Sequence, residues 1–262
     1  MRNRSLERKL LFVLLLSVPA FAANFWESKD YSKWSEQECA QLLKKSPWAF
    51  SIGFGNVGPA VIQPKTLDVE ELDAEKKKAA KPQAGPGMIT GVTYGEREST
   101  QFFEFRVLTA KPVKAAIVQM QVLRNPALKE QAKQIINAKP SDQIIIQFEY
   151  RSEPPGSSAV HEIHSYFLHA TLADFRTNTY LASDKVDLLP IKDYLSPNDK
   201  RPKPAFVFPR FNEKGEPYFT GQESSITMRS VFEPEIAGKK QKYDIFIKMN
   251  PKEMWFQKEF AF

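Results

Sequence analysis

Histidine is the residue type in this sequence with the clearest capacity for chemistry, because all three histidines lie in one short stretch, at His161, His164 and His169. A zinc-protease helix requires two histidines four residues apart, so that both imidazoles project from one face. Here the spacings are three and five residues. On a helix, His161 and His164 share a face and could chelate one metal ion, whereas Glu162 is turned away and His169 needs a bend to join them. Since histidines without a ligand are the commoner case, all three stay candidate metal ligands only, and we predict no bound metal ion or cofactor.

A glycine string lies in the first predicted strand. Gly53, Gly55 and Gly58 have the spacing of the dinucleotide-binding fingerprint G-x-G-x-x-G. That fingerprint needs a helix that opens at its last glycines, and Pro59 with the apolar residues after it predicts no such helix. We therefore interpret these glycines as bulges or as sites of close backbone approach.

The single cysteine, Cys39, excludes an intrachain disulfide bond. An exposed lone thiol is a hazard in an oxidising compartment, so we expect Cys39 to be buried. A nucleophilic role beside a histidine is the alternative, but no catalytic motif surrounds this cysteine. The sequence also contains no G-x-S-x-G elbow, Walker loop, C-x-x-C pair or EF-hand loop. We predict no catalytic residue.

Two tryptophans and one arginine are candidate interaction residues. Trp26 and Trp48 flank a predicted N-terminal helix, where they could form an exposed platform for carbohydrate or could instead fix the helix to the core, which is the commoner role. Arg210 follows the apolar residues Phe206–Phe208 and could bind an anion, although an arginine at the end of a strand is more often solvated or ion-paired.

The helix between those tryptophans is predicted over residues 36–45. Ser35 and Glu38 match a capping box, in which the Ser35 hydroxyl accepts from the Glu38 amide and the Glu38 carboxylate accepts from the Ser35 amide. Trp34 and Cys39 occupy the positions of a hydrophobic staple, so we expect them to be in contact. Lysines near the C-terminal end suit the helix dipole, and a proline then ends the helix.

Hydrophobic periodicity predicts the remaining elements. The expected strands are residues 49–63, 101–108, 144–150 and 171–181, then Ala205–Phe208, Ser225–Phe232, Tyr243–Met249 and Trp255–Phe262. The expected helices begin at Pro112, at Asn125-Pro126 and just before Val160. Turns are expected at Glu213–Gly215 and Ala237–Lys239. The fold class that follows is α+β, with an N-terminal helix, a mixed sheet with two crossover helices, and a C-terminal antiparallel sheet.

Residues 1–22 are predicted to be a cleavable signal peptide. A positively charged start precedes an apolar run, Leu10–Val18, which is too short to span a bilayer. Ala20-Phe21-Ala22 supplies the small-x-small pattern that a signal peptidase accepts, so the mature chain would begin at Ala23. The alternative is an uncleaved N-terminal anchor, which the short run disfavours. No second segment approaches membrane-spanning length.

The rest of the chain is expected to form one or two domains. Residues 23–196 are predicted to form an α+β region, with a mobile insertion or solvated helix over 64–88, where charged residues, proline and glycine replace large apolar ones. Residues 197–262 are predicted to form an antiparallel β region, either separate or in the same domain. The net charge is +6, and removal of residues 1–22 leaves 33 basic and 30 acidic side chains. This weak, interspersed charge argues against nucleic acid as a partner.

Motifs at both ends of the chain carry a family resemblance. They are Trp34-Ser35 with Glu38, Leu42-Leu43 and Ser46-Pro47-Trp48-Ala49, and then Phe208-Pro209-Arg210, Tyr243–Met249 and the residues from Met254 onward. With these motifs the sequence resembles exported acidobacterial proteins of unknown function. The resemblance covers the two ends and the middle only loosely. It implies export and common ancestry, implies no activity or site, and leaves the histidine cluster outside its motifs.

The function that these patterns favour is that of an exported protein, periplasmic or extracellular, which acts as a non-enzymatic binding or cell-envelope interaction module. Its candidate partner is another envelope protein. One alternative is a metal-dependent hydrolase that uses His161 and His164 with Glu162. Another is an assembly subunit, which would carry a large exposed apolar face.

Overall fold

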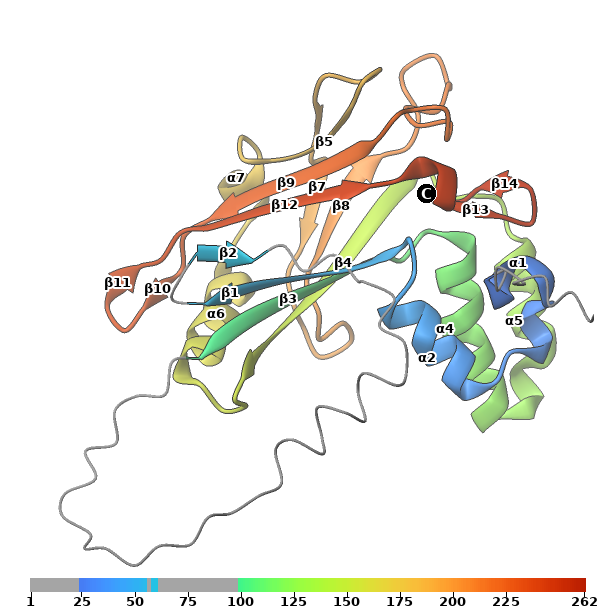
Figure 1. Cartoon of the computed structure of the whole chain (residues 1–262), viewed down its shortest axis with the longest axis horizontal. Coiled ribbons are helices and arrows are strands. Elements are labelled where there is room, and N and C mark those ends of the chain that lie inside the picture. The colour runs from blue at the N-terminus through green and yellow to red at the C-terminus, as the bar shows by residue number, and fades with distance from the viewer. Residues whose placement is uncertain (1–23, 56–57, 61–98) are drawn as a thin grey trace, which may run out of the picture.

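The computed structural model describes residues 24–55, 58–60 and 99–262 (Figure 1). The predicted signal peptide and the predicted insertion over 64–88 lie outside these ranges. The helices are α1 (Phe25–Ser28), η1 (Tyr31–Lys33), α2 (Glu36–Lys44), α4 (Lys111–Arg124), η2 (Pro126–Leu128), α5 (Lys129–Asn137), α6 (Ser158–His169), α7 (Leu172–Phe175) and η3 (Pro251–Glu253). The α+β class is confirmed.

The strands of the described residues form two main sheets and two small hairpins. One sheet has six strands in the order β2-β1-β3-β4-β8-β7, the other has four in the order β12-β9-β5-β6, and β10-β11 and β13-β14 are two-stranded. The strands are β1 (Ala49–Gly55), β2 (Gly58–Ala60), β3 (Thr100–Val107), β4 (Gln143–Glu153), β5 (Thr179–Ser183), β6 (Leu189–Pro190), β7 (Asp193–Leu195), β8 (Ala205–Pro209), β9 (Ile226–Phe232), β10 (Glu235–Ile236), β11 (Lys239–Lys240), β12 (Tyr243–Met249), β13 (Trp255–Phe256) and β14 (Glu259–Phe260).

Every strand pair in the described ranges is antiparallel. The prediction of a mixed sheet is therefore wrong for the six-stranded sheet. The helices α4 and α5 are likewise not crossovers, because they join β3 to its direct neighbour β4. An antiparallel neighbour starts at the end of the sheet where the previous strand finished. The two helices therefore gather with α2 at that end of the sheet (Figure 1).

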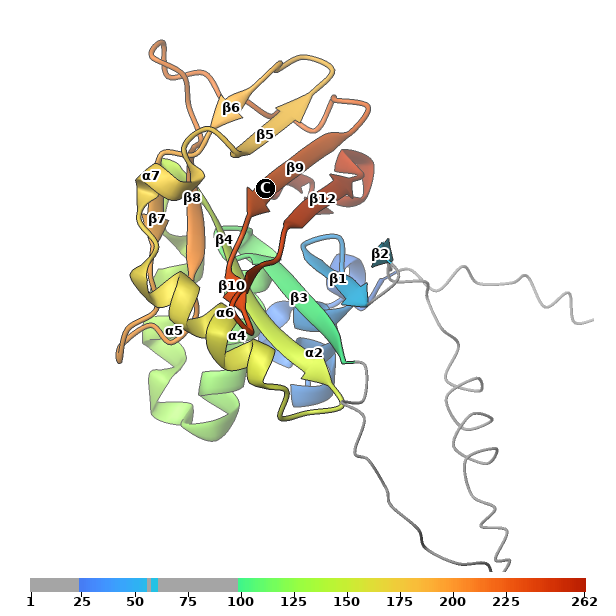
Figure 2. The same ribbon diagram turned by 90° about the vertical axis from the view of Figure 1, so that its left-hand side faces the viewer.

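Strands from both sides of residue 196 share both main sheets. β8 pairs with β4 and β7 in the six-stranded sheet, whereas β9 and β12 join β5 and β6 in the other. The loop near residue 196 therefore does not separate two sheets. Figure 2 shows the four-stranded sheet above the six-stranded one, with α6 and α7 along one side.

Three local predictions need correction. Residues 171–181 were expected to be one strand, but α7 comes first, because the Asp174 carboxylate accepts hydrogen bonds from the Thr171 amide and hydroxyl at its N-terminus. The strand expected over 49–63 is, in its described part, the hairpin of β1 and β2. The last strand is also a hairpin, β13–β14, whose turn residues Gln257 and Lys258 have positive φ.

The N-terminal helix forms as predicted. Ser35 and Glu38 make both hydrogen bonds of the capping box at the start of α2. Trp34 and Cys39 are buried. Gln119 of α4 donates to the backbone oxygens of Ser32 and Trp34, each at 3.1 Å. These bonds fix the first described segment to the α4 layer.

A buried carboxylate organises the turn that supports the C-terminal hairpin. Glu223 is 1% exposed, and its two oxygens accept from the Thr220 amide and hydroxyl, both at 3.0 Å, and from the Gly221 amide at 2.8 Å. Gly221 has φ +84°, and a Cβ there would lie 2.7 Å from the ring of Phe260, so only glycine fits. Burial alone would raise the pKa of Glu223, but the bonds from Thr220 and Gly221 hold that pKa below its usual value.

We expect Glu223→Gln to lower the free energy of unfolding at pH 7 by about 2 kcal/mol, because buried amide donors lose a charged acceptor. Since the folded pKa lies below the unfolded one, the contribution of the ionised carboxylate is complete above the unfolded pKa and is lost as the pH falls through the folded pKa. Urea unfolding of both proteins should therefore show a difference that shrinks below the usual glutamate pKa of 4.5. The exposed Glu213→Gln is the control, and an equal loss of stability in that variant would contradict the role of Glu223.

Candidate functional site

The helix α6 places the histidines. Its apolar residues Ala159, Ile163 and Phe167 recur at intervals of four and are buried, so one face packs on the core and the others are left for polar side chains. Phe167 lies 4.9 Å from the ring of Phe148 on β4, which fixes the rotation of the helix about its axis. That rotation decides which polar side chains share a surface.

The three histidines do not converge on one point. The exposed His164 makes a 2.6 Å hydrogen bond between its Nδ1 and the hydroxyl of Tyr150. His169 bonds through Nδ1 to the backbone oxygen of Ser165 at 2.7 Å, and His161 is exposed. Within 24–55, 58–60 and 99–262, no group of three His, Cys, Asp or Glu side chains is placed to hold a metal ion. His169 differs from the other two because it lies seven residues after Glu162 and shares its face of the helix.

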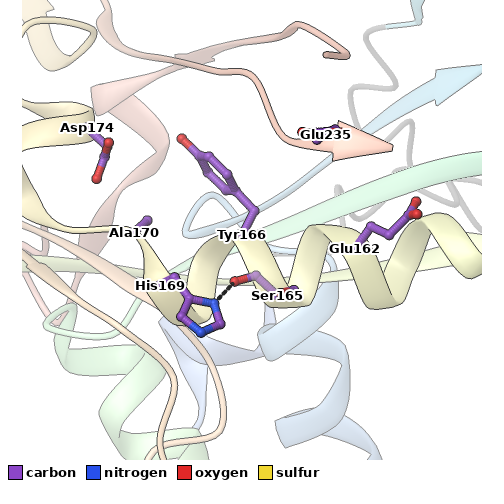
Figure 3. Close-up of a pocket in the computed structure, with 7 residues that line it drawn as sticks. All are labelled: Glu162, Ser165, Tyr166, His169, Ala170, Asp174 and Glu235. Carbon is purple, nitrogen blue, oxygen red and sulfur yellow. Dashed lines mark hydrogen bonds between the residues drawn. The ribbon is translucent and has the colours of Figure 1, made fainter. Parts of the chain in front are cut away.

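The face of α6 that carries Glu162 and His169 lines an open hollow of about 390 Å³ (Figure 3). Its lining residues are Glu162, Ser165, Tyr166, His169, Ala170, Asp174 and Glu235. They come from α6 and the residue that follows it, from α7 and from β10, so segments far apart in the sequence meet there. Three of these residues are carboxylates and none is lysine or arginine. The hollow therefore has a negative potential.

The carboxylates of the hollow differ in how they are held. The two Glu162 oxygens each accept from the Ala237 amide at 3.2 Å, in the turn between β10 and β11. Asp174 caps α7 through Thr171. Glu235 is exposed on β10, and Figure 3 shows it across from α6. Two carboxylates thus stabilise the rim, and Glu235 faces solvent.

Tyr166 is the aromatic residue of the hollow. Its ring stacks on the ring of Phe232, with 6.0 Å between centroids. Burial, together with the nearby charges of Asp174 and Glu233, raises the pKa of Tyr166 to about 12, so the phenol stays neutral at physiological pH.

Trp26 and Trp48 do not form a surface platform. They are 4% and 0% exposed, with 6.1 Å between their ring centroids, and Trp48 also donates through its indole nitrogen to the backbone oxygen of Ala261. Both rings therefore belong to the core instead of an interaction surface, and the bond to Ala261 joins Trp48 to the C-terminal segment. Large aromatic side chains gain more from this burial than from exposure.

Arg210 is also committed to the fold. Its guanidinium donates to three backbone oxygens, those of Ser141 at 2.6 Å, Gln143 at 3.4 Å and Phe262. Burial lowers the pKa of Arg210 despite the nearby Asp142. An arginine whose donors bond backbone oxygens holds strand ends together, and this arrangement does not present an anion site.

Burial explains Cys39, and strand pairing and close backbone approach explain the glycine string. Cys39 is fully buried, and burial together with the nearby Glu38 raises the pKa of its thiol to about 11. Gly53 and Gly55 lie in β1, and Gly58 pairs with Gly55 as part of β2, so no helix begins at the last glycine of the string. A Cβ on Gly53 would lie 2.9 Å from the ring of Phe102, which explains this glycine by close approach.

Sequence reasoning missed the hollow, although part of its signal was present. Glu162, Tyr166 and His169 are spaced four and then three residues apart, the pattern of one helical face. The histidine spacing instead indicated the neighbouring face of the helix, which carries His161 and His164. Glu235 is 73 residues beyond Glu162 in the numbering, and only the packing of the β10–β11 hairpin on α6 brings it near.

Comparison of the chain with protein-family models, curated proteins and solved structures gives no match to any of them. In the part of the chain that the structure describes, no helix has the length and apolar character needed to cross a membrane.

We expect the Cys39 thiol to be unreactive in the folded protein. A pKa of about 11 leaves roughly one thiolate in a thousand at pH 8, and burial blocks access. A chromogenic disulfide reagent should titrate almost no thiol in native protein and one thiol per chain in guanidinium chloride. Cys39→Ser is the blank, and rapid stoichiometric reaction of the native wild type would contradict burial.

Proposed function

We propose that this chain is an exported, non-enzymatic binding protein that acts at the cell envelope, and that its α6 hollow accepts a cationic side chain of a partner protein. The observation that carries the proposal is the charge of the hollow, where Glu162, Asp174 and Glu235 meet and the described lining contains no lysine or arginine. A carboxylate-lined concave surface attracts ammonium and guanidinium groups.

The bonds of the ionisable groups favour binding over catalysis. An acid or base that takes part in chemistry needs a partner within hydrogen-bond reach of the reacting group. Here Glu162 bonds a backbone amide, Asp174 caps a helix, and His164 bonds a tyrosine hydroxyl. Each group stabilises local structure, and Glu162 and Asp174 also give the hollow charge and shape.

Tyr166 adds a second attraction for the same ligand class. A cation near an aromatic ring gains about 0.5–1 kcal/mol at an exposed site. One face of the ring already stacks on Phe232, and Figure 3 shows the side chain standing between α6 and the level of Asp174 and Glu235. The ring and the carboxylates therefore act on one ligand group.

Export is the part of the proposal that rests on the sequence. The basic start, the short apolar run and Ala20-Phe21-Ala22 support a signal peptide. The resemblance to exported acidobacterial proteins supports the same location. Export favours a partner in the cell envelope, and the carboxylates of the hollow favour a partner with basic side chains on its surface.

Glu235→Gln is expected to weaken binding of a capped arginine–lysine tetrapeptide by roughly fivefold, because an exposed ion pair contributes up to about 1 kcal/mol. Isothermal titration at low salt would measure the change, and added salt should reduce the affinity of the wild type. The matched control is Glu213→Gln, which makes the same charge change in a distant turn. Equal weakening in both variants, or no binding by the wild type, would exclude the hollow as a cation site.

Export has a separate test. When the full chain is expressed in a bacterial host, mass spectrometry of the protein outside the cytoplasm should give a mature chain that begins at Ala23. Ala22→Arg should block cleavage, whereas Phe21→Leu should not, because the middle position of the motif is unconstrained. An intact Met1 on the exported wild-type protein would support the uncleaved anchor instead.

A further inference from the structure

A row of side chains crosses the outer face of the four-stranded sheet. Phe246 of β12 is opposite Arg229 of β9, Arg229 is opposite Tyr180 of β5, and Tyr180 is opposite Pro190 of β6. Directly opposite residues on neighbouring strands project to the same face. The four side chains therefore form one line, although they come from four separate strands.

This face is turned to solvent. Phe246 is 48% exposed, the Arg229 side chain is 43% exposed, Tyr180 is half-buried and Pro190 is exposed. The alternate residues of the same strands are buried and face the six-stranded sheet; they include Leu181, Met228, Ile245 and Ile247. Phe246 is thus an exposed aromatic residue in a strand whose other apolar residues are all buried.

The polar centre of the row presents both donors and acceptors. The Arg229 side chain donates two hydrogen bonds to the Asp244 carboxylate, one from Nε to Oδ1 at 3.0 Å and one from a terminal nitrogen to Oδ2 at 2.7 Å. The two side chains thus form a bidentate ion pair. The hydrogen bonds to Asp244, which has the larger effect, and to the Tyr180 hydroxyl raise the pKa of Arg229 above its usual value. A guanidinium has five N–H donors, so donors remain after this pairing. Because Asp244 balances the charge, the centre suits a ligand with hydroxyl groups better than a polyanion.

The spacing of the two rings restricts the ligand further. Phe246 and Tyr180 are two strands apart, a separation of about 10 Å. In an extended β-1,4-linked polysaccharide, alternate sugar rings present the same face at a comparable separation. The C–H face of a sugar stacks on an aromatic ring, and its hydroxyl groups bond paired charges such as Arg229 and Asp244.

We infer that the row Phe246–Arg229–Tyr180 is a binding platform for an extended β-1,4-linked polysaccharide. Two alternate sugars lie on the rings of Phe246 and Tyr180, and the sugar between them bonds Arg229 and Asp244. This platform is distinct from the α6 hollow and does not depend on the cationic partner proposed for it. For an envelope protein, such a surface would supply attachment to wall or matrix glycan.

Co-sedimentation of the purified chain with insoluble polysaccharides tests the inference. Chitin, cellulose and isolated peptidoglycan are the β-1,4-linked probes, and granular starch is the α-linked control. The wild type should sediment with at least one β-linked probe and not with starch. No sedimentation, or equal sedimentation with starch, would overturn the inference.

Variants locate the binding surface. Phe246→Ala and Tyr180→Ala should each lower the affinity about tenfold, whereas Tyr180→Phe, which keeps the ring, should lower it less. Leu123→Ala removes an equally exposed apolar side chain, 47% exposed on α4, and should bind as the wild type does. If Phe246→Ala does not fold, Phe246→Leu keeps apolar volume without the aromatic face and should also bind weakly. Wild-type affinity in a folded Phe246→Leu would overturn the inference.

The peptide titration separates this inference from the proposed function. Phe246→Leu should retain binding of the arginine–lysine tetrapeptide while it loses polysaccharide. Glu235→Gln should do the reverse. Loss of both ligands in both variants would overturn the assignment of polysaccharide to this face.

Discussion

Among the described residues, the two main sheets share no hydrogen-bonded strand, and aromatic rings hold them face to face. Phe103 of the six-stranded sheet lies 5.4 Å from Phe232 and 5.2 Å from Tyr243 of the four-stranded sheet. Phe167 of α6 lies 4.9 Å from Phe148 on one side and 4.9 Å from Phe232 on the other. Edge-to-face pairs of this kind add roughly 0.5–1.5 kcal/mol each beyond the area that they bury. Because these rings fix α6 and both inner faces, they also decide which residues point outward to form the hollow and the row.

The parts of the fold that depend on neighbours in the chain could be predicted from the sequence. Ser35 and Glu38 are three residues apart, so their capping box needs no other part of the protein. The turn at Ala237–Lys239 and the helix that begins near Pro112 follow from similarly local chemistry. The strand order could not be predicted this way, because antiparallel pairing brings together residues such as Ile144 and Phe208, which local periodicity does not connect.

The candidate surfaces were harder to predict for the same reason. The strict alternation of Tyr243, Ile245, Ile247 and Met249 does indicate that Phe246 faces away from the core. It does not indicate what lies beside Phe246, because Arg229 and Tyr180 become its neighbours only through the register of three strands. The buried position of Trp48 could not be predicted for the same reason, since its indole bonds Ala261, which is more than 200 residues away in the chain.

One long hairpin connects the two surfaces. β9 and β12 continue through the bonded pair Pro234 and Gln241 into β10 and β11, as Figure 1 shows. Arg229 lies near one end of this hairpin and Glu235 near the other, and the bond from the Ala237 amide to Glu162 attaches its tip to α6. A change that moved this tip would reshape the hollow, but the row lies where β9 is paired on both sides and is fixed by β5 and β12. The shape of the hollow therefore depends on the contact between this tip and α6, whereas the line of the row depends on the pairing of β9 with β5 and β12.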